Sequence, residues 1–302
     1  MNREETHVYT SPSVERAEGI FWPYIVVTKP GIVAMVIISA ISGMYVAGSG
    51  LPAPSHRLFW LVFSIGLATA AAAALNNYYD RDIDLIMRRT SGRPLPSGAA
   101  APMAVLLFGL TGSVVSVACA YEEINTLVAE LLAASIFIYV VVYTMFMKRR
   151  TPMATFIGGV GGALPPVIGY ATVNPILDKY ALALFIIIFA WQHPHFWSLA
   201  LKYIEEYRAA GVNNHAVALG VEATKRRIAL WAGILAAVSL LPWYIGMTGW
   251  IYLTGAAILG LVNMAMTLTF LFSEARLAMR IFYYSLLHLP ALYLLLLLDL
   301  TI

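Results

Sequence analysis

Charged residues are scarce in this chain of 302 residues. Asp, Glu, Lys and Arg together make up 12% of it, whereas soluble domains carry about 25%. Hydrophobic residues make up 60%, which is more than one core of this size could bury. These proportions exclude a soluble enzyme and an intrinsically disordered chain, and they indicate an integral membrane protein.

Two further shortages narrow the range of functions. The chain has one cysteine, Cys119, which lies inside an apolar run, so an internal disulfide and a cysteine-based zinc site are excluded. The net charge is only +3 and is spread over the whole chain. No basic patch suited to nucleic acid is therefore expected.

Long stretches without Asp, Glu, Lys or Arg are abundant. A helix needs about 20 apolar residues to cross a bilayer. The charge-free runs cover residues 30–56, 58–79, 94–121, 131–147, 151–177, 180–201, 228–273 and 281–298. Seven of them hold one span each, and the run 228–273 is long enough for two, with a turn at residues 246–249. We therefore expect nine transmembrane helices.

The positive charges predict how these helices are oriented. With nine spans, only Arg57 and Lys179 fall on one side of the membrane, and every other Lys and Arg falls on the opposite side. Because positive residues gather in cytoplasmic loops, we expect a cytoplasmic N-terminus and an extracytoplasmic C-terminus in the cell (inner or plasma) membrane. Residues 1–19 are polar and are expected to form a cytoplasmic tail before a single transmembrane domain, residues 20–302.

Polar residues at the end of the second span form a regular pattern. Asn76, Asp80 and Asp84 are spaced i, i+4 and i+8, so we expect them on one face of a helix. Two carboxylates would repel each other there, and a divalent cation such as Mg²⁺, which prefers carboxylate and amide oxygens, would relieve that repulsion. The alternative is a solvated helix end whose acids are neutralised by nearby arginines.

A basic loop containing two prolines follows directly. Residues 87–96 include Arg88, Arg89 and Arg93, and the planar guanidinium group suits contacts with two phosphate oxygens at once. Carboxylates that bind a metal ion, beside arginines that bind an anion, predict a diphosphate site. The general excess of positive residues in cytoplasmic loops would by itself explain one or two of these arginines.

The end of the sixth span carries a second group of polar and aromatic residues. Residues 191–197 read Trp-Gln-His-Pro-His-Phe-Trp. They indicate a polar pocket, because ionisable side chains are costly inside a bilayer and usually functional there. If the helix continues beyond this segment, His195, Lys202 and Glu206 lie on a single stripe. A hydrogen-bonded packing role for the histidines is the alternative.

The pattern Asn76-x-x-x-Asp80-x-x-x-Asp84 resembles the first aspartate-rich motif of the UbiA-type intramembrane prenyltransferases. Within that superfamily, five segments in order are similar to the protohaem IX farnesyltransferase (haem O synthase) branch. These segments are Asp-Arg-Asp-Ile-Asp at 80–84, Met-x-Arg-Thr-x-x-Arg-Pro-Leu at 87–95, Lys-Arg-Arg-Thr-Pro at 148–152, Gly-Gly-x-x-Gly-Ala-Leu-Pro-Pro at 158–166, and Trp-Gln-x-Pro-His-Phe-Trp at 191–197.

The resemblance implies a fold and a reaction. The fold is an all-α integral membrane protein with nine transmembrane helices around a central cavity, capped by cytoplasmic loops. The reaction is Mg²⁺-dependent transfer of a farnesyl group from farnesyl diphosphate to a vinyl group of haem b, with addition of water, to give haem O. Implied partners are these two substrates, the lipid bilayer, and haem-handling or oxidase-assembly membrane proteins.

The resemblance also assigns candidate site residues. Asp80, Asp84 and His195 are the candidate catalytic residues. The Mg²⁺ ligands would be Asn76, Asp80, Asp84, Glu206 and Glu205. The diphosphate would be bound by Arg88, Arg93, Lys148, Lys202 and Arg226. The haem pocket would contain Trp191, Gln192, His195 and Trp197.

Departures from the family pattern and two alternative functions accompany this assignment. Glu205 and Glu206 stand where the family usually has aspartates, so the second acidic pair has a longer reach. A related enzyme that prenylates an aromatic acid in quinone synthesis is one alternative. A haem-binding or transport membrane protein without catalysis is the other.

Overall fold

The structure is a computed structural model that describes residues 19–50 and 54–301. In that part of the chain, nine helical segments are long and apolar enough to cross a membrane, and the prediction of nine spans is confirmed. These segments are Pro30–Ala47, Ser55–Ile86, Pro102–Glu123, Thr126–Met147, Ala154–Ala171, Lys179–Lys202, Val221–Tyr244, Trp250–Leu271 and Ala275–Thr301. The expected tail, residues 1–19, lies outside the described residues except for Gly19.

Several spans are built from more than one helix. The elements in chain order are α1 (Trp22–Val27), α2 (Pro30–Ala47), α3 (Ser55–Ile86), α4 (Pro102–Glu123), α5 (Thr126–Ile136), the π-helical η1 (Phe137–Met147), α6 (Ala154–Ala163), α7 (Pro165–Ala171), α8 (Lys179–Lys202), α9 (Ile204–Ala209), α10 (His215–Leu219), α11 (Val221–Val238), α12 (Leu241–Tyr244), α13 (Trp250–Leu271), the 3₁₀ turn η2 (Ala275–Leu277) and α14 (Ala278–Thr301). The turn predicted at residues 246–249 separates α12 from α13.

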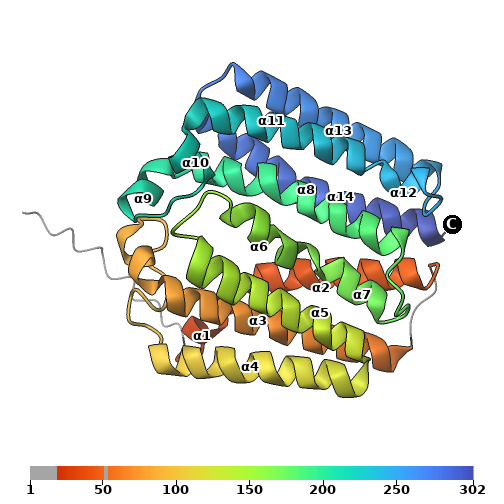
Figure 1. Cartoon of the computed structure of the whole chain (residues 1–302), viewed down its shortest axis with the longest axis horizontal. Coiled ribbons are helices and arrows are strands. Elements are labelled where there is room, and N and C mark those ends of the chain that lie inside the picture. Colours follow the sequence, from red (N-terminus) through yellow and green to blue (C-terminus); the bar gives the residue numbers. More distant parts are fainter. Residues whose placement is uncertain (1–18, 51–53, 302) are drawn as a thin grey trace, which may run out of the picture.

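The long helices lie side by side in one bundle, with α4 along one edge and α13 along the opposite edge (Figure 1). The loop between α3 and α4 lies at the same end as α9 and α10. We call this end the basic end, because Arg93 and Lys148 belong to it. Large apolar side chains are exposed on the outer helices, among them Leu107, Val114 and Leu261. Such a surface is matched to lipid rather than to water, so the chain is a multi-pass membrane protein.

Two glycines allow α2 and α7 to pack closely. A Cβ atom at Gly169 would overlap the carbonyl oxygen of Ala40, and one at Gly43 would overlap that of Pro166. α7 starts at Pro165, which suits the first turn of a helix because its missing N–H would have no partner there. The fifth span is therefore divided, and its second half lies directly against α2.

This contact gives a stability prediction. We expect Gly169→Ala to lower the thermal unfolding midpoint of the purified protein, at a cost of about 1–3 kcal/mol, because backbone must move to admit the methyl group. Gly31→Ala is the matched control, since nothing lies within 4 Å of a Cβ at that helical position. Equal unfolding midpoints for the two variants would show that α2 and α7 can move apart without a loss of stability.

One expectation about the basic end is wrong in detail. α3 continues to Ile86, and the basic loop begins after it. The stripe from His195 to Glu206 required an unbroken helix, but α8 ends at Lys202. The backbone N–H of Tyr203 still donates to Leu199 O. However, the backbone ψ angle of Tyr203 is 28°, which is not helical, so the chain changes direction before α9 begins.

Candidate active site

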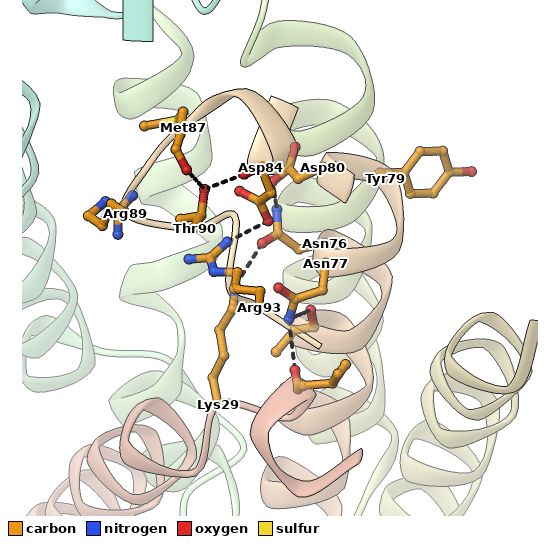
Figure 2. A network of polar contacts seen from close by, with 12 residues as sticks. Lys29, Asn76, Asn77, Tyr79, Asp80, Asp84, Met87, Arg89, Thr90 and Arg93 are labelled. Atoms are coloured by element: carbon orange, nitrogen blue, oxygen red, sulfur yellow. Dashed lines mark hydrogen bonds and ion pairs between the residues drawn. The ribbon is translucent and has the colours of Figure 1, made fainter. Parts of the chain in front are cut away.

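Asn76, Asp80 and Asp84 lie on one buried face of α3, as their spacing predicts (Figure 2). Asp80 has no exposed surface, whereas Asp82 between the two buried acids is exposed. Tyr79 points away from the group. The helix therefore directs one amide and two carboxylates inward at its basic end and leaves the third acid of the sequence outside.

Asp80 has one satisfied and one unsatisfied oxygen. Its Oδ2 accepts hydrogen bonds from Asn76 Nδ2 at 2.7 Å and from Lys148 Nζ at 2.5 Å. Its Oδ1 is buried without a hydrogen-bond partner in the described part of the chain. A buried carboxylate oxygen is costly unless it is paired. The geometry therefore leaves a coordination position open at Asp80.

Asp84 is held by the loop that follows α3. Arg93 Nη1 donates to Asp84 Oδ2 at 2.7 Å. The loop folds back because the buried hydroxyl of Thr90 donates to the backbone oxygen of Asp84 at 3.1 Å, and Leu95 is buried at the base of the loop. Figure 2 shows Arg93 reaching across to the acids. The predicted proximity of the basic loop and the carboxylates is present.

Lys148 and Arg149 contact opposite sides of α3. Lys148, directly after η1, pairs with buried Asp80, while Arg149 pairs with exposed Asp82 at 2.6 Å and with the carbonyl of Tyr79 at 2.9 Å. Burial alone would lower the pKa of Lys148, but the charge and hydrogen bond of Asp80, together with Tyr143 and Tyr207, raise that pKa above its ordinary value. Lys148 therefore remains a cation inside the site.

Lys29 is a site residue that the sequence did not reveal. Its Nζ donates to Asn76 Oδ1 at 2.7 Å, and its backbone has φ 54° and ψ 63°, a left-handed conformation that is rare for lysine. Burial, reinforced by the cations of Arg93 and Lys148, lowers the pKa of Lys29 to about 7. The only signal in the sequence was a lysine at the start of the first span, which membrane orientation also explains.

The remaining predicted phosphate and metal ligands lie farther out. Arg88, Lys202 and Arg226 are exposed at the basic end. Glu205 pairs with Arg208 at 2.5 Å. Glu206 Oε2 accepts from the backbone N–H of Arg89 at 3.2 Å, so it touches the loop after α3 but not the buried acids. Among the described residues, no three His, Cys, Asp or Glu side chains are grouped to hold a metal ion.

The four predicted haem-pocket residues of α8 face three different neighbouring helices. Trp191 and His195 face α14, where Trp191 Nε1 donates to Ser285 O at 2.8 Å and the His195 ring contacts Ser285 Oγ. Gln192 instead donates to Gly159 O of α6 at 3.0 Å. Trp197 stacks on His215, with ring centroids 4.3 Å apart. The structure therefore brings Trp191 and His195 together and places the other two elsewhere.

Comparison with known proteins places the chain in a family. The UbiA prenyltransferase family profile matches residues 36–295. The chain belongs to the UbiA prenyltransferase family. It is 41% identical over 283 residues to the protoheme IX farnesyltransferase of Aquifex aeolicus, a match that covers 94% of this chain and 97% of that protein. The predicted resemblance is thereby confirmed.

Solved structures support the fold. A structure of digeranylgeranylglyceryl phosphate synthase matches with a TM-score of 0.77 and 16% identity, over 93% of this chain and 99% of that one. A UbiA homologue from Archaeoglobus fulgidus bound to GPP and Mg²⁺ matches with a TM-score of 0.62 and 18% identity, over 91% and 99%. The predicted all-helical membrane prenyltransferase fold is confirmed.

Proposed function

We propose that this chain transfers a farnesyl group from farnesyl diphosphate to a vinyl group of haem b, with addition of water, to give haem O and diphosphate. The identity to the A. aeolicus farnesyltransferase over 94% of the chain supports the choice of substrates. The observation that carries the chemistry is the pair of buried acids, Asp80 and Asp84, each paired with a cation of its own. A structural helix end would have no reason to bury such a cluster.

The cluster fits Mg²⁺. Asn76, Asp80 and Asp84 offer hard oxygen donors, and Oδ1 of Asp80 is buried without a partner among the described residues. Mg²⁺ is usually held by one or two carboxylates together with substrate phosphates rather than by a complete protein cage, which agrees with the absence of a larger cluster of acids in the described part of the chain. When bound, Mg²⁺ would neutralise charge on the departing diphosphate.

Three cations of this chain would bind the same diphosphate. Lys148, Arg93 and Lys29 each donate to an oxygen of the three polar residues on α3. Their hydrogen bonds would pass to phosphate oxygens as the metal ion takes the carboxylates. A diphosphate beside Lys29 would raise its lowered pKa again and hold it protonated. Arg88, Lys202 and Arg226 would form an outer ring of positive charge at the basic end, and Glu205 and Glu206 would add metal ligands there.

The reaction needs a dry site once the C–O bond breaks. The leaving diphosphate takes the bonding electron pair, and the vinyl group of haem attacks the resulting allylic cation to form the new C–C bond. Water then adds to the second cation and loses a proton. The rings of Tyr139 and Tyr143, both residues of η1, stack with their centroids 5.8 Å apart, shortly before Lys148 in the chain. Aromatic faces of this kind stabilise positive charge and exclude water.

The orientation belongs to the same proposal. The basic end would face the cytoplasm, because positive residues concentrate there, and the diphosphate would enter from that side. The domain would cover residues 20–302 after a cytoplasmic tail, in the cell membrane. Haem would reach the site from the bilayer or from a haem-handling membrane protein.

A turnover assay tests the function. Purified protein in detergent or lipid, given haem b, farnesyl diphosphate and Mg²⁺, is expected to yield a haem species heavier by farnesyl plus water, read by mass spectrometry. Chelation of the metal is expected to abolish this product. Diphosphate release without a change in haem would contradict the haem acceptor and favour aromatic acids. No diphosphate release under any condition would favour a non-catalytic protein.

A further inference from the structure

We propose that Ser285 of α14 is a positioning residue that holds His195 of α8 with its Nε2 lone pair directed at the iron of the haem substrate. This inference rests on the proposed function, because it takes haem as the acceptor. It assigns a role to a serine for which the sequence offered no motif.

The contacts of Ser285 offer His195 a defined tautomer. Ser285 Oγ lies 2.6 Å from Phe282 O and 2.7 Å from His195 Nδ1, and a hydroxyl has only one hydrogen to donate. When that hydrogen is donated to Phe282 O, Ser285 Oγ accepts from the N–H of His195 Nδ1, and Nε2 of the neutral ring keeps its lone pair. This is the tautomer that the proposal requires.

Stacked aromatic rings also fix the orientation of the His195 ring. Trp191 stacks on one side with centroids 4.5 Å apart and an interplanar angle of 20°. Phe282 lies at 4.6 Å and 26°. The indole N–H of Trp191 donates to the backbone oxygen of Ser285, so the same serine anchors a stacking partner as well as the imidazole.

His195 differs from the two other histidines on α8 and α14. His193 and His288 have no exposed surface, and their nitrogens that lack partners are fully enclosed. His195 keeps 8% exposure, and its Nε2 is neither hydrogen bonded within the described residues nor among the enclosed atoms. The adjacent Phe196 is 46% exposed, so a haem in the bilayer can approach this part of α8.

This arrangement matches how proteins present a metal-binding imidazole. A ligating histidine donates its other N–H to a fixed acceptor, which sets the tautomer and the ring orientation. Coordination by Nε2 would fix the porphyrin plane and so decide where its vinyl groups lie. Ser285 would act through His195 and need not touch the substrate.

Haem titration of the purified protein, followed by absorption and electron paramagnetic resonance, tests the assignment. We expect the wild type to show a histidine–iron signature that is lost in His195→Ala. Ser285→Ala is expected to weaken haem binding by about 10- to 100-fold and to alter the iron signature. Ser285→Thr, which keeps the hydroxyl, is expected to restore both. The KM for haem should rise in Ser285→Ala while that for farnesyl diphosphate stays unchanged.

Ser239→Ala is the matched control, because Ser239 is a buried serine whose hydroxyl donates to a backbone oxygen and contacts no histidine. A folded Ser285→Ala with wild-type affinity and spectrum would overturn the role of Ser285. A wild type that farnesylates haem without a histidine–iron signature would overturn iron coordination alone. A wild type that neither binds nor converts haem would overturn the proposed function as well.

Discussion

Asp80→Asn is expected to slow prenyl transfer by about 10²- to 10³-fold, a loss of the size seen when a charge-stabilising group is removed from a reacting centre. The amide keeps the shape of the side chain and can still pair with Asn76. It removes the negative charge that both the metal ion and Lys148 require. The measurement is the initial rate of farnesyl-haem formation at saturating substrates.

The control for this prediction lies two residues along the same helix. Asp82→Asn removes an acid of the same motif, but that carboxylate is exposed and pairs with Arg149 on the outside of α3. Exposed ion pairs contribute little to stability, so the rate of prenyl transfer by Asp82→Asn is expected to stay close to that of the wild type. Binding of Mn²⁺, followed by electron paramagnetic resonance in the presence of farnesyl diphosphate, should fall only in Asp80→Asn. Equal losses of rate and of Mn²⁺ binding in the two variants would mean that activity depends on all acids of α3 rather than on those of its buried face.

Local periodicity explains why the first half of the site was predictable. Asn76, Asp80 and Asp84 belong to one helix, and their spacing alone determines that they share a face. The cations that meet them come from distant parts of the chain. Lys29 precedes Asn76 by 47 residues and Lys148 follows Asp80 by 68. Which basic residue reaches which acid depends on how α2 and η1 pack against α3, and spacing carries no information about that packing.

Helical geometry also explains why the haem pocket was predicted too broadly. Residues 191–197 are adjacent in sequence, but successive helical side chains point in different directions. Trp191 and His195, four residues apart, share the face toward α14. Gln192 packs against α6, where a Cβ at Gly162 would overlap its side chain. His193 stacks on Trp231 of α11, with centroids 3.8 Å apart. The partner Ser285 lies 90 residues away, in a span where the sequence offered no motif.

Lys148→Met is expected to cause the largest combined loss of stability and activity. The substitution keeps the apolar stem of the side chain but leaves the carboxylate of Asp80, whose side chain is 1% exposed, without its cation. Removing one partner of a buried pair typically costs about 3–5 kcal/mol, because the remaining charge is stranded. Prenyl transfer should also fall by about 10²- to 10³-fold, since a cation that stabilises the departing diphosphate is lost.

The double variant Asp80→Asn/Lys148→Met separates these two effects. Neutralising both partners removes the stranded charge, so the double variant is expected to unfold at a higher temperature than Lys148→Met while remaining inactive. Arg149→Met is the matched control, because its pair with Asp82 is solvent-exposed and such pairs contribute at most about 1 kcal/mol. Strictly additive losses in the double variant would contradict a direct interaction between Asp80 and Lys148. Recovery of stability without recovery of turnover would instead show that this pair is retained for its chemistry, since the fold alone tolerates its absence.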